Sequence, residues 1–544
     1  MSKRVPHAVA ALGLAASVLL LVGAIGGTAH AQEACGGRVT GAGDPCGDLT
    51  GSGKDVFGAE PPAFSDLDDD AGASLIDQVG KNKVAVNMAW LLLTGFLVLF
   101  MQAGFALVET GFTRAKNAAH TMAMNFMVFA LGVIGYFLVG FALQFGGVGG
   151  ITAIGGTPPL TGSFCIGDWC LWGTKGFALS EVYDVGVLGF FMFQLVFMDT
   201  AATIVTGAMA ERWKWGAFVV YSFFMSMVLY PLFGNWAWGG GFLAKLGTTL
   251  GLGHGYVDFA GSGVVHAVGG LCALAGAMVI GPRIGKYNPD GSANPMPGHN
   301  IPLAIAGTFI LLFGWFGFNP GSTFAATDLR ISAVAVNTVL ASATGAFAAM
   351  LWCMRPSRFG KPDPAMMANG MLAGLVGITA PSGFVAPWAA ALIGAVAGVL
   401  VVESVQLLDR LRIDDPVGAV SVHGTCGLWG VVALGLFADG TYGAGWNGVE
   451  GTVKGLFYGD PSQLLAQLAG VGTLLLWAFG LSWAFFKVQD RVQGLRVSAE
   501  EELQGLDLPL MGALAYPDFV LTDGQRRAPV GELVEASSRS PDRT

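Results

Sequence analysis

Two stretches of this chain share one pattern: Asp258-Phe-Ala-Gly-Ser-Gly-Val-Val-His-Ala-Val-Gly-Gly-Leu271 and Asp415-Pro-Val-Gly-Ala-Val-Ser-Val-His-Gly-Thr-Cys-Gly-Leu428. Both read D-x2-G-x3-V-H-x3-G-L, and six of the fourteen positions agree, including an aspartate and a histidine eight residues later. Chance similarity between Gly- and Val-rich segments is the alternative explanation. We interpret the stretches as corresponding parts of an internal repeat.

The chain around the repeat has the composition of a membrane protein. Of its 544 residues, 53% are hydrophobic and only 12% are charged, whereas soluble proteins carry about 25% charged residues. The charged residues gather toward the two ends of the chain. This composition excludes a soluble enzyme, a nucleic-acid-binding protein with a basic face and a disulfide-dense secreted domain. We expect no catalytic residue, no cofactor and no nucleic acid partner, and we expect membrane lipid around the middle of the chain.

Apolar stretches between turn signals predict an all-α polytopic membrane protein with eleven transmembrane helices. The expected spans are 84–110, 117–145, 185–209, 215–233, 260–281, 302–318, 331–353, 367–380, 385–408, 417–437 and 464–487. The repeat falls at the fifth and tenth spans. Because each half then has five spans, the second half begins on the opposite side of the membrane. This predicts a five-plus-five inverted repeat, which transporters use to place a site near the membrane midplane.

The loops give the expected orientation, because cytoplasmic loops carry an excess of Lys and Arg. With the N-terminus outside, eleven such residues fall on the inner side and four on the outer side. The inner set is Arg114, Lys116, Arg212, Lys214, Arg283, Lys286, Arg355, Arg358, Lys361, Arg410 and Arg412, and the outer set is Lys175, Lys245, Arg330 and Lys454. The C-terminus is therefore predicted to lie in the cytoplasm, and the protein in the cell (cytoplasmic, or inner) membrane.

The N-terminus has the features of a targeting segment. Lys3 and Arg4 precede an apolar run from Val9 to Ile25 and an A-x-A sequence at 29–31. This pattern predicts a cleavable signal peptide over 1–31; a first membrane anchor is the alternative, although the run is short for a span. Residues 32–83 are expected to form an acidic extracytoplasmic segment, 84–488 the transmembrane domain and 489–544 a cytoplasmic tail.

Four of the seven cysteines lie in segments expected on the outer side, where an oxidising environment permits disulfides. They are Cys35, Cys46, Cys165 and Cys170, and the sequence leaves their pairing open. The other three cysteines lie in or beside spans and are expected to pack there. No CxxC spacing supports a metal site.

The histidines of the repeat are the first candidate site residues. His266 and His423 are the two of seven histidines that occupy deep, repeat-related positions. Ionisable groups inside a membrane are costly and usually face a cavity or each other. Two neutral imidazoles can share a hydrogen bond and offer one donor and one acceptor to a small polar solute. Asp258, nearer the outer end of its span, could cap the helix or favour a cation.

Aromatic side chains are the second group of candidates. Phe197, Trp238, Trp315 and Phe318 lie on different spans or at loop edges, and Ser322 follows the sixth span. Aromatic faces attract a cation, and a hydroxyl can accept a hydrogen bond from it. Taken singly, these residues are more typical of ordinary core or interface aromatics. Asp199 and Glu403 also lie in spans, with no partner evident from the sequence.

Several motifs together resemble the Amt/Mep/Rh superfamily, and specifically bacterial Amt ammonium transporters. They are GAMAER (207–212), WGGG (238–241), VDFAGSGVVH (257–266), GWFGFNPGS (314–322), GLVGITAPSGFV (374–385) and DDPVGAVSVHGTCGLWG (414–430). The resemblance extends over roughly residues 84–516. It implies a homotrimer with one hydrophobic pore in each subunit, and ammonium or ammonia as the substrate.

Position by position, the resemblance also implies roles for the candidate residues. Trp238 and Ser322 correspond to an outer site that recruits ammonium, and Phe197 and Phe318 to the gate beneath it. His266 and His423 correspond to the twin pore histidines, and Asp258 to the aspartate that supports deprotonation. Trp315 and Thr379 correspond to the lining of the pore and vestibule. The expected function is recruitment and deprotonation of ammonium, followed by conduction of ammonia, with or without the proton, into the cytoplasm.

The chain also departs from the family pattern. Met198 and Asp199 follow the gate phenylalanine where relatives often have small residues. Met511-Gly512-Ala513 stands where relatives often have H-G-E, in a tail that commonly contacts a neighbouring subunit and a PII-type signal protein. The resemblance implies a PII-type signal protein as a partner, and the changed tail leaves this expectation open. Three alternative interpretations of the function are an ammonium sensor or transceptor, an Rh-like ammonia gas channel, and a haem-bearing redox subunit with His266 and His423 as axial ligands.

Overall fold

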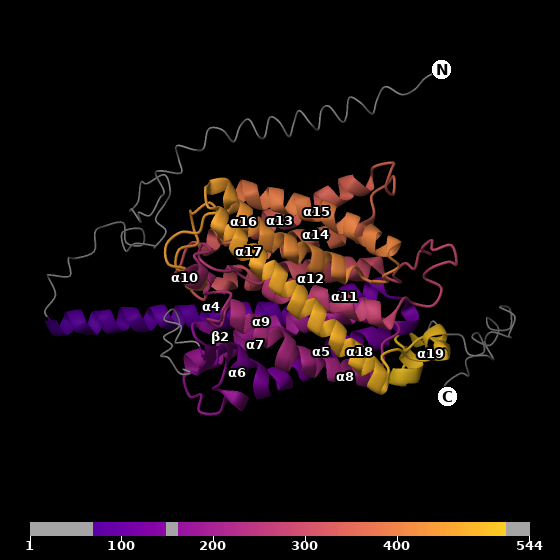
Figure 1. Cartoon of the computed structure of the whole chain (residues 1–544), viewed down its shortest axis with the longest axis horizontal. Helices are drawn as coiled ribbons and strands as arrows, with labels where there is room; N and C mark the ends of the chain where they lie inside the picture. Colours follow the sequence, from indigo (N-terminus) through magenta and orange to yellow (C-terminus); the bar gives the residue numbers. More distant parts are fainter. Residues whose placement is uncertain (1–68, 148–161, 518–544) are drawn as a thin grey trace, which may run out of the picture.

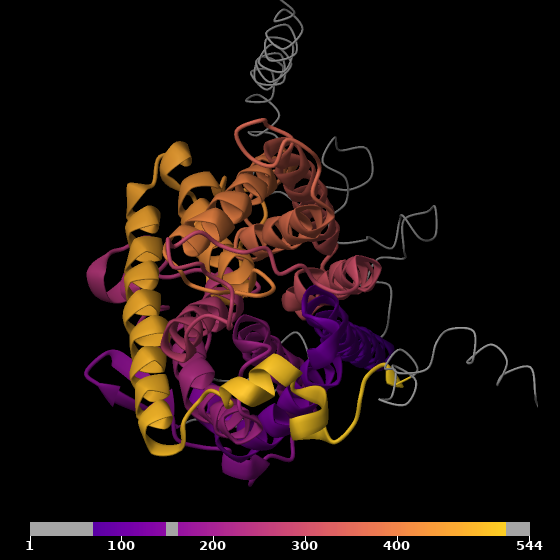
Figure 2. The same cartoon turned by 90° about the vertical axis from the view of Figure 1, so that its right-hand side faces the viewer.

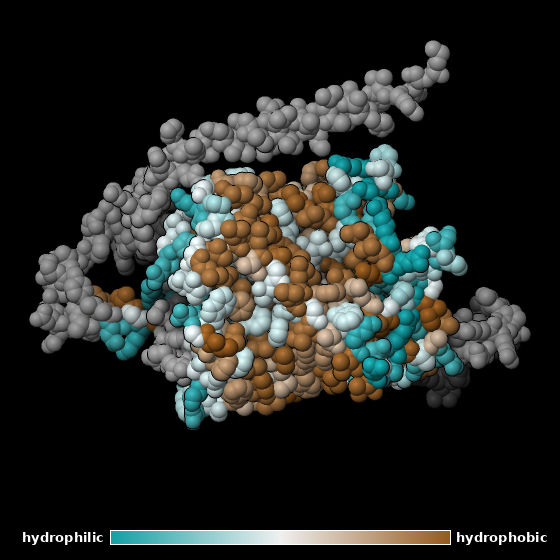
Figure 3. Space-filling model, in the orientation of Figure 1, coloured by the Kyte–Doolittle hydropathy of each residue, from teal (hydrophilic) through white to brown (hydrophobic). Residues whose placement is uncertain are grey.

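The computed structural model describes residues 69–147 and 162–517. In these ranges it is a bundle of helices whose long axes run in broadly the same direction (Figure 1). On the face drawn in Figure 3, hydrophobic residues cover a broad band over the middle of the bundle, and hydrophilic residues gather toward both ends. The predicted signal peptide, Cys35 and Cys46 lie outside the described residues.

The first half of the bundle contains α4 (Asp69–Phe112), α5 (Ala118–Gly135), η3 (Tyr136–Gly140), α6 (Phe141–Phe145), α7 (Val185–Met209), α8 (Trp215–Phe224), η6 (Met225–Leu229), α9 (Tyr230–Ala237), α10 (Leu246–Leu250), η7 (Ser262–Ala267) and α11 (Val268–Ile280). The second half contains α12 (Ile301–Phe318), η8 (Pro320–Thr323), α13 (Ile331–Cys353), α14 (Pro364–Thr379), α15 (Pro387–Arg410), η9 (Val420–Thr425), α16 (Cys426–Phe437), α17 (Pro461–Leu474), η12 (Leu475–Leu481) and α18 (Ser482–Gln493). The tail adds α19 (Ala499–Gln504) and η13 (Asp507–Met511). Short 3-10 turns are η2 (Ala115–Asn117), η5 (Phe177–Leu179), η10 (Trp446–Gly448) and η11 (Leu456–Tyr458).

Ten helices in the described part of the chain are long and apolar enough to cross a membrane. They correspond to ten of the eleven expected spans. The eighth expected span coincides with α14, which is apolar but only 16 residues long. The prediction of an all-α, multi-pass membrane protein is confirmed.

Several helix starts are fixed by a capping side chain followed by proline. Asn300, Asp363 and Asp460 each accept a hydrogen bond from a backbone N–H two or three residues later, and a proline follows within the first turn. Such caps satisfy N–H groups that a helix leaves unpaired at its start, and proline has no N–H to lose there. These caps define where three of the spans begin.

Small residues let helices in the second half approach closely. A Cβ atom added to Gly374 would lie 2.1 Å from the carbonyl oxygen of Ala341, and one added to Gly398 would lie 2.2 Å from that of Gly345. The backbones of α13, α14 and α15 are therefore in direct contact, as expected for small-residue packing in membranes. This packing accounts for part of the high glycine content.

Helix α4 begins fifteen residues earlier than its expected span. It starts at Asp69 rather than residue 84, and its first turns project beyond the rest of the bundle (Figure 1). Residues 77–83 are exposed, and Lys81 pairs with Asp77 one turn away. The acidic segment before the membrane is thus helical from Asp69, because exposed i, i+4 pairs can continue a helix into water.

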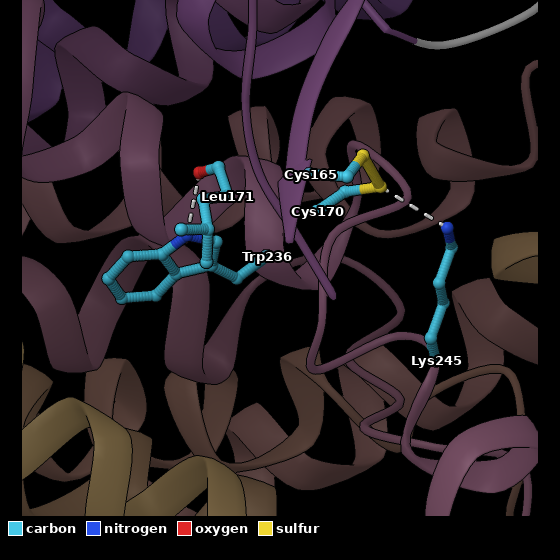
Figure 4. Close-up of a disulfide and its surroundings, with 5 residues drawn as sticks. All are labelled: Cys165, Cys170, Leu171, Trp236 and Lys245. Carbon is cyan, nitrogen blue, oxygen red and sulfur yellow. Dashed lines mark hydrogen bonds between the residues drawn. A yellow bond between two sulfur atoms is a disulfide. The ribbon is translucent and has the colours of Figure 1, made fainter. Parts of the chain in front are cut away.

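A β-hairpin lies at the same end of the bundle as the start of α4, and we call this the hairpin end. Strands β1 (Ser163–Ile166) and β2 (Trp169–Gly173) pair antiparallel. A disulfide joins Cys165 and Cys170 across the hairpin (Figure 4). Trp236 donates its indole hydrogen to the backbone carbonyl of Leu171 at 2.8 Å, which ties the hairpin to α9 (Figure 4).

The C-terminal tail packs across the opposite end of the bundle, which we call the tail end (Figure 2). Asp507 accepts hydrogen bonds from the backbone N–H groups of Ala119 and His120 at the start of α5. Lys116 donates to the carbonyls of Glu502 and Leu503. The tail is therefore anchored on the bundle of the same chain as far as Tyr516, which hydrogen-bonds His299.

Candidate functional site

The two copies of the repeat start with the same local structure. Asp258 accepts hydrogen bonds from the backbone of the residues three, five and six positions later, and Asp415 from those three and five positions later. The third residue after each aspartate is a glycine in the left-handed region, with φ of 114° at Gly261 and 81° at Gly418. Since residues with a Cβ rarely adopt such values, glycine is required there. Each turn then leads into a π-helical segment, η7 or η9.

The two repeat helices cross antiparallel in the interior of the bundle. Segment η7 contacts α16, and η9 contacts α11, so the start of each helix meets the later part of the other. Corresponding glycines allow this contact. A Cβ on Gly270 would lie 2.0 Å from the amide nitrogen of Gly424, and one on Gly427 would lie 2.5 Å from the carbonyl oxygen of Ser262. The crossing brings the two repeat histidines face to face.

His266 and His423 share a hydrogen bond between their Nδ1 atoms at 3.1 Å. One neutral ring must donate in this bond and the other accept. The Nε2 atom of His266 is buried without a hydrogen-bond partner in the described residues. His423 is 4% exposed and His266 is fully buried, so His423 is the more accessible member of the pair. The two rings form a polar pair inside an apolar bundle.

A series of rings connects this pair to the hairpin end. The ring of His266 stacks with those of Trp315 and Phe318 at centroid distances of 5.1 and 5.3 Å. Phe318 stacks on Phe197 at 4.1 Å, and Phe197 meets Trp238 edge-on at 6.2 Å. We call these six residues, including His423, the ring row. The interior rings are fully buried or nearly so, and Trp238 is half-buried.

Hydrogen bonds fix the edges of the ring row. The indole N–H of Trp238 donates to the carbonyl of Asp258 at 2.7 Å. The Ser322 hydroxyl, which is half-buried, donates to the carbonyl of Phe318 at 2.7 Å. The indole N–H of Trp315 donates to the Thr379 hydroxyl at 2.9 Å. The structure thus brings all nine predicted site residues into one connected group.

Asp258 caps η7, and both of its carboxylate oxygens are engaged. Replacing it with alanine leaves three backbone N–H groups without their acceptor and removes a constraint on the Trp238 contact. We expect Asp258→Ala to lower the free energy of unfolding by about 1–3 kcal/mol, since buried donors then lack partners. Chemical denaturation in detergent checks this effect; wild-type stability would contradict the capping role.

Two cavities lie on the tail-end side of the histidine pair. The smaller one measures about 20 Å³ and is lined by His423, Glu109, Asn369 and apolar side chains. The larger one measures about 360 Å³, and its lining includes Arg283, Lys286, Asp409 and Asp415. Asn369 and Val417 line both cavities. Sequence reasoning missed Glu109, although an acidic residue inside an expected span is itself a signal of function.

The geometry of the histidine pair does not suit two ligands on opposite sides of one haem iron. Metal–nitrogen bonds are about 2 Å long, so two nitrogens on opposite sides of one metal would lie about 4 Å apart. The Nδ1 atoms face each other at 3.1 Å, and aromatic rings pack against His266. In the described part of the chain, no group of three His, Cys, Asp or Glu side chains is placed to hold a metal ion. The haem interpretation therefore lacks support.

The bundle and its buried ring row define a multi-pass α-helical membrane protein. The model of the ammonium transporter family matches residues 89–516. The chain therefore belongs to the ammonium transporter family, within the Amt/Mep/Rh superfamily, whose named members are membrane transport proteins rather than enzymes.

Individual relatives agree with this assignment. The chain is 47% identical to ammonium transporter Amt2 of Archaeoglobus fulgidus over 447 residues, which is 81% of this chain and 90% of the relative. Among solved structures, a "Sensor Amt Protein" matches with a TM-score of 0.69 and 35% identity, covering 79% of this chain and 99% of that one. Mep2 of Candida albicans matches with a TM-score of 0.67 and 29% identity, covering 81% and 93%.

Proposed function

We propose that this protein takes up ammonium at the hairpin end, removes its proton near the ring row and conducts ammonia past the two histidines to the tail end. The observation that carries the proposal is the continuous series from Trp238 through Phe197 and Phe318 to the His266–His423 pair. Its half-buried end offers an aromatic face to a cation, and its buried end offers nitrogen atoms to a neutral amine.

Recruitment and gating are assigned to different parts of the row. Trp238 and Ser322 lie at the half-buried end, where an aromatic face and a hydroxyl together suit ammonium. Phe197 and Phe318 stack directly beneath, so a solute passes only when these rings move apart. Trp315 and Thr379 line the next level, and Asp258 holds the turn that positions Trp238.

Selectivity follows from the chemistry of the buried rings. Ammonium and potassium are similar in size and charge, and a dehydrated cation among aromatic rings is costly. Ammonium can be deprotonated and cross as ammonia, whereas potassium has no proton to lose. The histidine pair then hydrogen-bonds the amine and offers a path for the separated proton.

The proposal includes an orientation and an assembly. The excess of Lys and Arg in loops at the tail end supports a cytoplasmic tail end and an outer hairpin end, and the disulfide in the hairpin fits an oxidising exterior. We propose a cleaved signal peptide at 1–31, a location in the cytoplasmic membrane, a homotrimer and a PII-type signal protein as a partner of the tail. These points rest on the sequence pattern and the family resemblance.

A sensing role is the second candidate, favoured by the similarity to a protein named "Sensor Amt Protein". An Rh-like ammonia gas channel is a further alternative, although the Trp238 and Ser322 pair supports recruitment of a cation. Uptake of ¹⁵N-ammonium into proteoliposomes distinguishes transport from sensing. We expect uptake above that of empty vesicles, unaffected by excess potassium. Uptake equal to that of empty vesicles would contradict transport.

A further inference from the structure

Glu109 is a buried acidic side chain that lies outside the ring row. It lies on the membrane-spanning part of α4 and is 3% exposed. None of the ion pairs within residues 69–147 and 162–517 involves it. A carboxyl group inside a membrane without a cationic partner is costly, and such groups commonly serve ion or proton movement.

Two neighbouring helices hold the Glu109 carboxyl group in place. The side-chain amide of Asn125 on α5 donates to one oxygen at 2.7 Å, and the Thr206 hydroxyl on α7 lies within 2.8 to 2.9 Å of both oxygens. Thr203 in turn donates to the amide oxygen of Asn125 at 2.9 Å, which fixes the orientation of that amide. The carboxyl group is therefore positioned by hydrogen bonds from neutral groups, and these can accompany either protonation state.

Glu109 and His423 line the same small cavity. Its volume of about 20 Å³ is enough for one water molecule, which needs about 10–15 Å³ by the same kind of measure. The remaining lining is largely apolar, with Phe105, Ile204 and Leu311 among its residues, and it contains no other titratable side chain. Because Asn369 and Val417 also line the larger cavity of about 360 Å³, the small cavity that Glu109 and His423 share adjoins that larger cavity.

We propose that Glu109 carries the proton from the histidine pair to ammonia as ammonia leaves toward the tail end. This inference rests on the proposed function. The protonated pair gives its proton, through water in the small cavity, to the Glu109 carboxylate, leaving neutral histidines and a carboxylic acid. The acid then protonates an emerging ammonia, giving ammonium and restoring the carboxylate. In each cycle one ammonia and one proton cross separately and recombine as ammonium, so the cycle moves one positive charge.

The test uses Glu109→Gln in proteoliposomes, with ammonium-evoked current and ammonia permeation measured on the same preparation. Glutamine preserves the size and can still accept from Asn125, but it cannot carry a proton. We expect the current to fall by about 100-fold or more, as for loss of a positioned proton-transfer group. Ammonia permeation, read as internal alkalinisation above that of empty vesicles, should persist. Glu109→Asp should keep part of the current.

The matched control is Thr110→Val, the adjacent position on α4, whose hydroxyl is buried without a partner in the described residues. It should keep the wild-type current. An unchanged current in Glu109→Gln would overturn the proposal, and so would an equal loss of current and ammonia permeation, because that result indicates a structural role. If the wild-type protein shows neither uptake nor current, the proposed function itself fails, whatever Glu109 does.

Discussion

Replacing His266 and His423 together with leucine is expected to abolish ammonium-selective transport. The pair is the polar contact inside an apolar ring row, and it is linked by a 3.1 Å hydrogen bond between Nδ1 atoms. Leucine offers no donor to ammonia and no site for a proton. The ammonium current should fall by about 100-fold or more, the usual scale for loss of proton-transfer groups, or a potassium current that the wild type lacks should appear.

The matched control for this double variant is His120→Leu. His120 is also fully buried, but its ring packs against Trp215 and lies outside the ring row. Currents evoked separately by ammonium and potassium in proteoliposomes give the comparison. The control should keep wild-type selectivity. If the double variant also kept wild-type flux and selectivity, the role assigned to the two histidines would be wrong.

Asp414→Asn is expected to give the largest loss of stability. Asp414 binds Arg283 in a two-point ion pair, with hydrogen bonds of 2.8 to 2.9 Å, and Arg283 also contacts Glu211. All three side chains are buried. They join the loops after α7, after α11 and before η9, where the second repeat begins. Removing one charge from a buried pair costs about 3–5 kcal/mol, so the free energy of unfolding should fall by that amount.

Asp409→Asn is the matched control, because Asp409 forms an ion pair with Lys286 at 3.0 Å on the same end but is 39% exposed. Exposed pairs contribute about 1 kcal/mol or less. Chemical denaturation of both variants in detergent measures the difference. Equal effects would show that the buried network does not stabilise the tail end as described.

The Asp414 network also predicts the direction of acid sensitivity. Burial on its own would raise the pKa of the Asp414 carboxyl, but the guanidinium groups of Arg212 and Arg283 hold this pKa below its ordinary value. A depressed pKa in the folded state stabilises the protein at pH values above the unfolded pKa, about 3.9. This stabilisation is present at neutral pH and should be lost as the pH falls below about 4. Asp414→Asn should lack that part of the acid response.

Much of the site could be predicted because its residues lie in a repeated pattern. The spacing of aspartate, glycine and histidine in both copies is enough to expect a symmetric pair, and the structure finds the two rings in contact. The rings of Phe197, Trp238 and Phe318 carry no such pattern, and only the family resemblance assigned them to the same row. Their mutual contacts come from helices far apart in the sequence.

Other features depend on contacts that one sequence cannot reveal. The role proposed for Glu109 rests on its hydrogen bonds with Asn125 and Thr206 and on the cavity that it shares with His423. Glu403, which had no evident partner, pairs with Arg358 at 2.6 Å and accepts from the Trp352 indole. Cys165 and Cys170 are brought together by a β-hairpin whose strands are too short to be predicted from the composition of the segment. Asp199 is buried with one oxygen unpartnered in the described residues, and nothing in the structure explains it.

The central claim is that ammonium gives up its proton and crosses the ring row as ammonia, while the proton moves separately. Current from proteoliposomes on a solid-supported membrane tests it most directly, with an ammonium pulse followed by a potassium pulse of equal concentration. The account predicts a transient current for ammonium and none for potassium. Potassium current of similar size would contradict it, because that result requires an intact ion to pass the rings.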